Sequence, residues 1–103
     1  MDFLLDGPED GPVTLLLAHG AGAPMDSASL NATTAALAAE GLRIARFEFV
    51  YMASRRSGQR KPPPRAESLK PEYLAAVDAL SASGPLIIGG KSMGGRVASM
   101  IAD

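Results

Sequence analysis

Apolar runs and polar breaks along the chain predict strands and helices in alternation. Two continuous apolar runs, at residues 13–18 and 86–89, are typical of buried strands covered on both faces. Residues 42–49 predict another strand, although charged side chains interrupt its apolar positions. A short apolar run at residues 3–5 predicts one more strand near the N-terminus. We expect these runs to supply the strands of one sheet.

Helices are predicted in the segments between the strands. Residues 27–40 are rich in alanine and leucine and stop at Gly41, a residue suited to ending a helix. Candidates for the N-terminal cap of this helix are Asp26, Ser27 and Ser29. Residues 67–82 predict a second helix, in which Pro71 is tolerable only in the first turn. Its apolar face is formed by Leu69, Tyr73, Val77 and Leu80. Residues 94–102 begin a third helix.

Two segments have the composition of loops. Residues 6–12 are dense in turn-forming residues, and residues 53–66 have no helical or strand period. The order strand, helix, strand, helix, strand, helix is typical of parallel strands joined by right-handed crossovers. We therefore expect an α/β fold, a parallel sheet with flanking helices, and we assign residues 1–103 to a single domain.

The strongest chemical motif lies between the last predicted strand and the last helix. Ser92 stands there with Gly90 two residues before it and Gly94 two residues after it. A serine in such a sharp turn has a strained backbone and an exposed hydroxyl, and the flanking glycines avoid collisions. The N–H of Met93 points to where an oxyanion would form, at the positive end of a helix. This pattern favours a catalytic serine in a nucleophile elbow over an ordinary serine in a tight turn.

A second candidate element follows the strand at residues 13–18. His19, Gly20, Ala21 and Gly22 form a glycine-rich turn, which we expect to lie beside the serine turn. In that position the N–H of Ala21 would be the second donor of an oxyanion hole, and the two glycines would let the backbone approach a substrate. We interpret His19 as a residue that orients this turn by hydrogen bonding, in preference to a catalytic base.

With these motifs the chain resembles the KANL/TEX-type branch of the α/β-hydrolases. The shared stretches are residues 17–23, residues 46–49 with Tyr51 and Met52, and residues 89–96. The resemblance implies that Ser92 is the nucleophile and that Ala21 and Met93 supply the oxyanion N–H groups. It also implies that the catalytic acid and histidine follow the nucleophile at long intervals, beyond Asp103.

The resemblance implies a serine hydrolase that cleaves a small-molecule ester or related acyl bond. The chain stops at Asp103 directly after an uncapped helical pattern, so we expect the N-terminal part of a truncated α/β-hydrolase domain. Without the acid and base we expect this fragment to be inactive. The alternative is a non-catalytic protein that keeps the fold as a binding module or scaffold.

Composition and charge limit the metals, cofactors and partners that we expect. The chain has no cysteine and one histidine, so we expect no metal site and no cofactor. The net charge of −1 gives no reason to expect nucleic acid or an anionic membrane as a partner. The first residues lack the basic character of a signal peptide, and no apolar run has the length of a membrane span. We therefore expect a cytoplasmic protein.

Two nucleotide-binding motifs are only approximated. A phosphate-binding loop ending at Ser92 would need glycine where Pro85 stands. A dinucleotide-binding turn starting at Gly20 would need its third glycine at Met25, although Glu48 resembles the acid that binds ribose. A dinucleotide-binding domain therefore remains an alternative to the hydrolase, whereas we reject nucleotide hydrolysis.

Basic residues and an apolar strand edge are expected at the surface. The segment from Arg55 to Arg65 holds five of the ten basic residues and a run of three prolines. We interpret it as a solvated loop, with docking of an acidic partner or a substrate carboxylate as the alternative. Lys91 and Arg96 flank the serine turn and either attract an anionic substrate or face water. The strand at residues 86–89 should leave an unpaired apolar edge, from which we expect a homodimer or another association.

Overall fold

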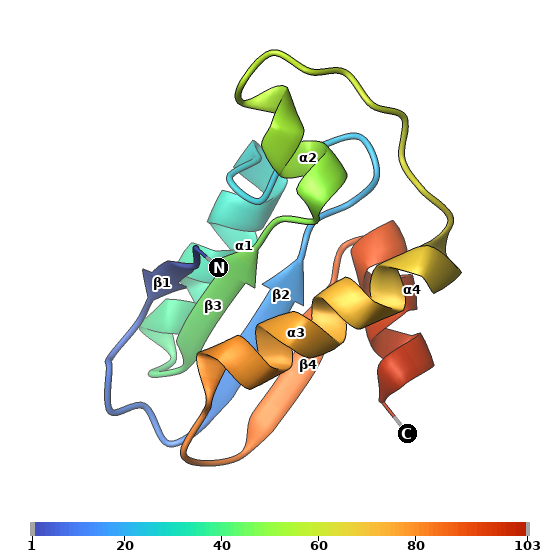
Figure 1. Ribbon diagram of the computed structural model, residues 1–103. Coiled ribbons are helices and arrows are strands. Elements are labelled where there is room, and N and C mark those ends of the chain that lie inside the picture. The colour runs from blue at the N-terminus through green and yellow to red at the C-terminus, as the bar shows by residue number, and fades with distance from the viewer. Residues whose placement is uncertain (1, 103) are drawn as a thin grey trace.

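A computed structural model describes residues 2–102 and contains a mixed, mainly parallel sheet flanked by helices (Figure 1). The order of its strands across the sheet is β1-β3-β2-β4. The strand bounds are Leu4–Asp6 for β1, Thr14–Ala18 for β2, Arg43–Phe47 for β3 and Leu86–Gly90 for β4. Strand β2 is parallel to both β3 and β4, whereas β1 runs antiparallel to β3. The predicted α/β class is confirmed, and β1 is an antiparallel addition at one edge.

Helices cover both faces of this sheet. Their bounds are Ala28–Ala39 for α1, Val50–Arg55 for α2, Lys70–Leu80 for α3 and Met93–Ile101 for α4, with a 3-10 turn η1 at Ala66–Leu69. Helix α1 lies behind the sheet and α3 crosses in front of it (Figure 1). Helix α4 packs against α3, β4 and β2. Among residues 2–102, no helix is long and apolar enough to cross a membrane.

The main core lies between the sheet and the α3–α4 layer. Leu16, Phe47, Tyr73 and Val97 have no solvent exposure there. The rings of Phe47 and Tyr73 meet edge to face with 4.9 Å between their centroids, a favourable geometry for an aromatic pair. Strand alternation turns the intervening side chains to the other face, where Ile44 of β3 is also fully buried.

Several predicted helix ends are confirmed. The side chain of Ser27 caps α1, because its Oγ accepts a hydrogen bond from the Leu30 N–H at 3.3 Å. Gly41 follows this helix with φ +87°, a conformation that glycine adopts without strain. Pro71 lies in the first turn of α3, as its missing N–H requires.

Other predicted bounds were wrong. The expected loop at residues 53–66 overlaps helix α2, which forms because Tyr51 and Met52 are buried in the core. Asp6 belongs to β1 rather than to the next loop, where its carboxylate pairs with Arg46 at 3.0 Å. The helix expected at residues 67–82 begins as the 3-10 turn η1. The expectation about Asp103 lies outside the described residues.

Strand β4 is less buried than its apolar sequence predicts. It lies at one end of the sheet and pairs only with β2 among residues 2–102. Ile87 is therefore 54% exposed, whereas Leu16 on the central strand β2 has no exposure. The expected association through this edge stays a prediction.

Candidate functional site

Ser92 occupies a sharp bend between β4 and α4. Its backbone has φ 54° and ψ −114°, so it is one of the non-glycine residues of the described chain with positive φ. The Lys91 N–H donates to the Ala18 carbonyl at 3.1 Å, which ties the bend to the end of β2. The Arg96 N–H donates to the Ser92 carbonyl at 3.0 Å and starts the helix. The bend therefore holds the serine side chain, which is exposed, at the carboxyl end of the parallel strands.

Close backbone packing explains the glycines around this serine. A Cβ atom on Gly90 would lie 2.6 Å from the carbonyl carbon of Gly94 and 2.7 Å from the Ala18 oxygen. A Cβ atom on Gly94 would lie 2.6 Å from that same oxygen. Gly95, which the sequence did not single out, is crowded as well, because its Cβ would lie 2.7 Å from the Gly90 oxygen. Three glycines thus let β2, the bend and α4 approach more closely than side chains allow.

The turn after β2 lies against the serine bend, as predicted. A Cβ atom on Gly20 would lie 3.7 Å from the Cβ of Ser92 and 3.4 Å from the Lys91 carbonyl oxygen. A Cβ atom on Gly22 would meet nothing within 4 Å, and this residue does not have positive φ. Both distances at Gly20 are ordinary van der Waals contacts, so they place the two turns side by side but give no packing reason for glycine at position 20 or at position 22.

The predicted oxyanion donors line one cavity together with the serine. Ala21, Ser92 and Met93 border a space of about 500 Å³. Its other walls are Pro63, Pro64, Ala66 and Arg96. Among residues 2–102, neither the Ala21 N–H nor the Met93 N–H has a hydrogen-bond acceptor. Two backbone donors from separate loops are thus left unsatisfied beside one exposed hydroxyl.

His19 orients the peptide group that carries the Ala21 N–H. Its Nδ1 lies 2.6 Å from the Gly20 carbonyl oxygen, and its Nε2 accepts the Phe49 N–H at 3.2 Å. Because Nε2 accepts, the ring proton lies on Nδ1 and is donated to the Gly20 carbonyl. The carbonyl of Gly20 and the N–H of Ala21 belong to one planar trans peptide and point in opposite directions. Fixing the carbonyl therefore fixes the N–H.

The His19 ring is unsuited to the role of catalytic base. It has no solvent exposure, both ring nitrogens are engaged, and its edge packs against the rings of Phe49 and Tyr51. Burial lowers its pKa below the ordinary value of 6.5, against the opposing effect of the hydrogen bond to Gly20. The geometry agrees with the interpretation of His19 as a residue that orients the turn.

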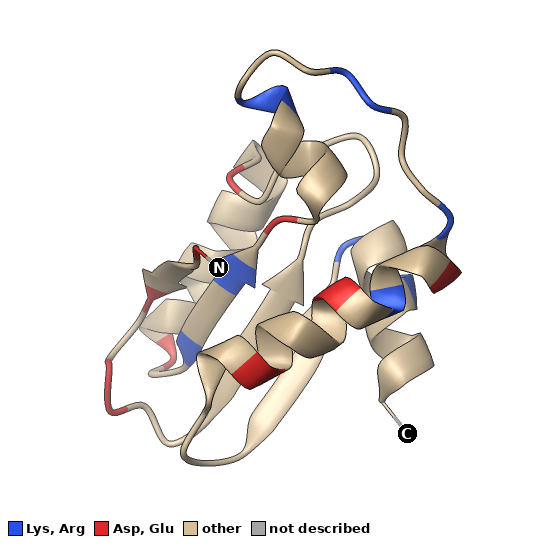
Figure 2. Ribbon diagram, viewed as in Figure 1, with Lys and Arg blue, Asp and Glu red and all other residues tan. Residues whose placement is uncertain are grey.

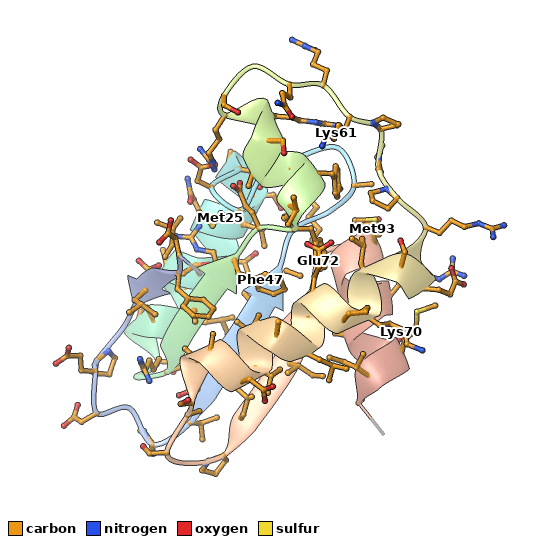
Figure 3. The ribbon with its side chains drawn as sticks, viewed as in Figure 1. Met25, Phe47, Lys61, Lys70, Glu72 and Met93 are labelled. Carbon is orange, nitrogen blue, oxygen red and sulfur yellow. The ribbon has the colours of Figure 1, made fainter. Side chains whose placement is uncertain are left out.

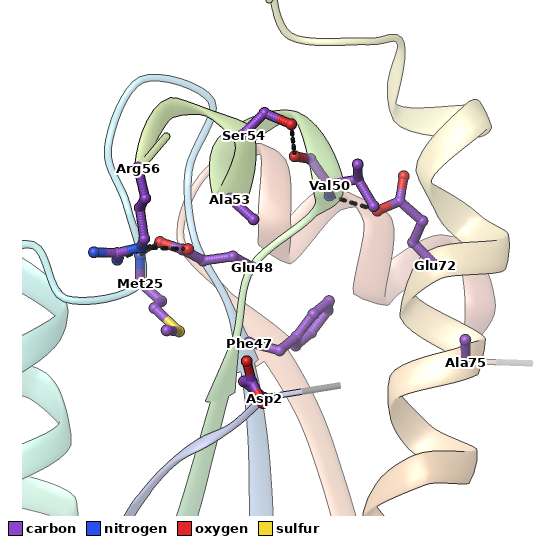
Figure 4. A pocket seen from close by; sticks show the side chains of 10 residues that line it. All are labelled: Asp2, Met25, Phe47, Glu48, Val50, Ala53, Ser54, Arg56, Glu72 and Ala75. Carbon is purple, nitrogen blue, oxygen red and sulfur yellow. Dashed lines mark hydrogen bonds and ion pairs between the residues drawn. The ribbon is translucent and has the colours of Figure 1, made fainter. Parts of the chain in front are cut away.

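A network of charged groups, which the sequence analysis missed, braces the loop that follows Ala21. The buried carboxylate of Glu48 accepts the Met25 N–H at 3.2 Å and two hydrogen bonds from the Arg56 guanidinium, at 2.6 and 2.8 Å (Figure 4). Arg56 also pairs with Asp26 at 2.9 Å. On the other side, Arg46 donates to the Met25 carbonyl at 2.9 Å. The loop is therefore held from β3 and from α2.

These contacts shift the pKa values of the two carboxylates in the network, Glu48 and Asp26. Burial alone would raise the pKa of Glu48, but hydrogen bonds from Arg56 and from the Met25 N–H outweigh it and lower that pKa. The hydrogen bond from Arg56 likewise lowers the pKa of Asp26. Both carboxylates are therefore ionised at neutral pH. The only sequence signal for this brace was the shared stretch at residues 46–49, which did not reveal its partners.

Tyr51 fixes the same turn from a different direction. Its hydroxyl donates to the Ala21 carbonyl at 2.9 Å, and its ring lies in the core below. Helix α2, which the sequence did not predict, thus contributes a contact to the candidate site. Tyr51 was noted in the sequence only as part of a shared stretch.

A larger cavity of about 780 Å³ lies at the carboxyl end of β3, between α2 and α3 (Figure 4). Its polar wall includes Glu48 and Glu72, and the Glu72 carboxylate accepts the Val50 N–H at 2.8 Å. Figure 4 shows that both acids are engaged by neighbouring groups. None of its lining residues borders the Ser92 cavity. Size alone does not make this cavity the reactive site, because the exposed serine and the unsatisfied N–H groups lie elsewhere.

The residues present do not form an evident metal centre. Within residues 2–102, no group of three or more histidine, aspartate or glutamate side chains is arranged to hold a metal ion. A dinucleotide also finds little support, because Glu48, the expected ribose ligand, is occupied by Arg56 and by the Met25 N–H. The arrangement at the bend is instead suited to a hydroxyl attacking a carbonyl group whose oxygen binds two N–H donors.

Comparison with known proteins agrees with this fold. No curated protein and no solved structure gives a significant match to the chain. The family model of the alpha/beta hydrolase domain, however, matches residues 11–103. This match covers β2 to α4, and with it both turns of the candidate site. The chain therefore belongs to the alpha/beta hydrolase domain family.

Proposed function

We propose that this chain carries the nucleophile and the oxyanion hole of a serine hydrolase that cleaves esters or related acyl bonds of small molecules. One observation carries the proposal. The exposed Ser92 hydroxyl shares a cavity with the N–H groups of Ala21 and Met93, and neither N–H has an acceptor among residues 2–102. Unsatisfied donors are costly in a folded protein unless a ligand or water binds them.

The proposed reaction is acyl transfer to water in two steps. In the first, the Ser92 oxygen forms a bond to the acyl carbon and gives its proton to a general base. The bond from the acyl carbon to the leaving oxygen breaks, and the leaving group takes the proton from that base. In the second, a water oxygen bonds to the acyl carbon and gives a proton to the base. The bond between the acyl carbon and the Ser92 oxygen then breaks, the Ser92 oxygen takes the proton from the base, and the acid product departs. In both steps the negative carbonyl oxygen is stabilised by the N–H groups of Ala21 and Met93.

The general base is not found within residues 2–102. His19, the only histidine of the chain, is buried and uses both ring nitrogens. We therefore propose that the base and its acidic partner come from a segment that follows Asp103. On this proposal residues 1–103 alone hydrolyse substrate several orders of magnitude more slowly than the full-length protein.

The proposal extends to the branch of the family and to the cellular location. Residues 17–23, 46–49 and 89–96 support membership in the KANL/TEX-type branch. We also propose a cytoplasmic location, with which the lack of a helix able to cross a membrane among residues 2–102 is compatible.

A fluorophosphonate probe tests the nucleophile. Applied to the full-length protein, it should form a covalent adduct on Ser92 that peptide mass spectrometry locates. Ser92→Ala should abolish the adduct, while Ser99→Ala, which removes an exposed serine of the same helix, should leave it unchanged. Absence of an adduct on the wild-type protein would exclude the nucleophile and favour a non-catalytic binding protein.

A further inference from the structure

One arginine without an ion-pair partner borders the Ser92 cavity, and a second borders the space beside it. Arg96 lines that cavity and also an adjoining one of about 370 Å³, which it shares with Arg65. Among residues 2–102, neither arginine forms an ion pair, whereas Arg46 and Arg56 both do. Glu67 lines the adjoining cavity too, yet it makes no ion pair with either arginine. The positive charge beside the serine is therefore not neutralised by the described chain.

The position of Arg96 relative to the serine is fixed by the helix. Arg96 lies four residues after Ser92, and its N–H donates to the Ser92 carbonyl at 3.0 Å. Residues four apart lie on one side of a helix, about 6 Å apart along its axis. An arginine at this position is close enough to contact a group attached to an acyl carbon bound at Ser92.

The extended segment after α2 forms the opposite wall. Pro63 and Pro64 line the Ser92 cavity, and Arg65 follows them directly. Prolines restrict the backbone and so reduce the entropy lost when the wall is ordered. In Figure 2 basic residues mark the trace between α2 and η1. Figure 3 labels Lys61 on this segment and Met93 below it, on α4.

We propose that Arg96, assisted by Arg65, selects substrates that carry a negatively charged group near the scissile acyl bond. This inference rests on the proposed hydrolase function and adds the substrate class. The guanidinium groups of Arg96 and Arg65 bind the anionic group, either a carboxylate or a phosphate, while the acyl carbonyl binds the N–H groups of Ala21 and Met93. Guanidinium groups form charge-assisted, bidentate hydrogen bonds to both anions. Arg96 acts here as a specificity-determining residue and takes no part in bond breaking.

A pair of matched probes tests this selectivity on the full-length protein. Two alkyl fluorophosphonates of equal length are compared, one ending in a carboxylate and one ending in its neutral methyl ester. A third, ending in a phosphate, distinguishes the two anions. The measured quantity is the ratio of the adduct formation rates at Ser92 for the anionic and neutral probes. We expect the wild-type ratio to exceed that of Arg96→Gln by about tenfold, as for the loss of one charge-assisted contact.

Matched variants make the result interpretable. Arg60→Gln also removes one positive charge, from the extended segment after α2 that carries Arg65. Arg60 does not line the Ser92 cavity, so this variant should keep the wild-type ratio. Arg65→Gln should lower the ratio less than Arg96→Gln, and Arg96→Lys should restore part of it. Added salt should reduce the wild-type ratio as it screens exposed charges.

The outcomes separate the two proposals. If the neutral probe labels Ser92 but Arg96→Gln keeps the wild-type ratio, the charge selectivity is wrong and the hydrolase proposal stands. If Arg60→Gln lowers the ratio as much as Arg96→Gln, general surface charge replaces the proposed contact. If neither probe labels the wild-type protein, the proposed function fails and the substrate class fails with it.

Discussion

The Tyr73 hydroxyl lies 2.7 Å from the Gly89 carbonyl oxygen and accepts the Gly89 N–H at 3.1 Å. It also lies 2.7 Å from the Leu16 carbonyl oxygen of the neighbouring strand, so its one proton is shared between two carbonyls. Burial raises the pKa of Tyr73 to about 12, and the hydroxyl therefore keeps its proton at neutral pH. Helix α3 thus holds β2 and β4 together three residues before Ser92.

The first prediction concerns this hydroxyl. Tyr73→Phe should lower the free energy of unfolding by about 1–3 kcal/mol, because it leaves buried backbone groups without their partner. Urea unfolding of the wild type and the variant measures the change. Tyr51→Phe is the matched control, since it removes one hydrogen bond, to the Ala21 carbonyl, and should cost about 1 kcal/mol or less. Equal effects of the two substitutions would contradict the bridging role of Tyr73.

The glycines of the bend should differ sharply in their tolerance of a methyl group. Gly94→Ala should destabilise the protein by about 3 kcal/mol or more, because its Cβ would overlap backbone atoms of Ala18 that cannot rotate away. Gly22→Ala should change stability by no more than about 0.5 kcal/mol, because open space surrounds that position. Thermal unfolding followed by circular dichroism compares the two variants. A Gly94→Ala protein as stable as Gly22→Ala would show that the close packing is absent.

Backbone strain at Ser92 should lower the free energy of unfolding by a measurable amount. Glycine adopts φ 54° at lower cost than serine or alanine, so Ser92→Gly should be more stable than Ser92→Ala by about 1–2 kcal/mol. Both variants remove the hydroxyl, so the comparison isolates the conformation of the backbone. Urea unfolding of the two variants gives the difference. If Ser92→Ala is equally stable, the bend is relaxed.

Buried His19 should make the protein acid-sensitive. Because burial lowers its pKa below 6.5, the unfolded chain binds a proton on His19 that the folded protein does not. The contribution of His19 to the free energy of unfolding should therefore be constant above about pH 7 and be lost progressively as the pH falls from 6.5 toward 5. Glu48 and Asp26 have lowered pKa values and contribute to acid sensitivity only below 4.5 and 3.8 respectively. His19→Gln should lose the slope between pH 7 and 5, which urea titrations at successive pH values measure.

Arg56 and Glu48, which together hold the loop at Met25, should be energetically coupled. Arg56→Gln leaves the buried Glu48 carboxylate with the Met25 N–H as its remaining donor, and should cost about 1–2 kcal/mol, since Arg56 itself is half exposed. Adding Glu48→Gln should recover part of the loss, because a neutral amide needs no counter-charge. The double-mutant cycle from urea unfolding measures this coupling, and simple additivity of the two substitutions would refute it.

The sequence alone was sufficient for the elements with strong local signals. The apolar runs predicted β2 and β4 to within a residue. Gly41 marked the end of α1, and Ser27 was one of the three candidates for its N-terminal cap. The glycines spaced two residues on either side of Ser92 predicted a crowded bend. These features depend on periodicity and on backbone conformations of neighbouring residues, and both are written locally in the chain.

Contacts between distant segments were beyond the reach of such signals. Helix α2 was not predicted, and its last three residues were expected in a loop, because its two buried residues meet a core that only the fold assembles. The bonds from Glu48 and Arg46 to Met25 join segments more than twenty residues apart, and no local pattern encodes them. The exposure of Ile87 likewise depends on which strand ends the sheet.

The sequence by itself determined the alternation of strands and helices, the position of the serine bend and the need for glycine at Gly90 and Gly94. Only the tertiary structure decided which peptide group each ring nitrogen of His19 bonds and what holds the Ala21 turn. It also decided that Arg96 borders the same cavity as the serine. The reason is physical. Local preferences act between neighbours in the chain, whereas burial and hydrogen-bond partners are fixed when remote segments pack.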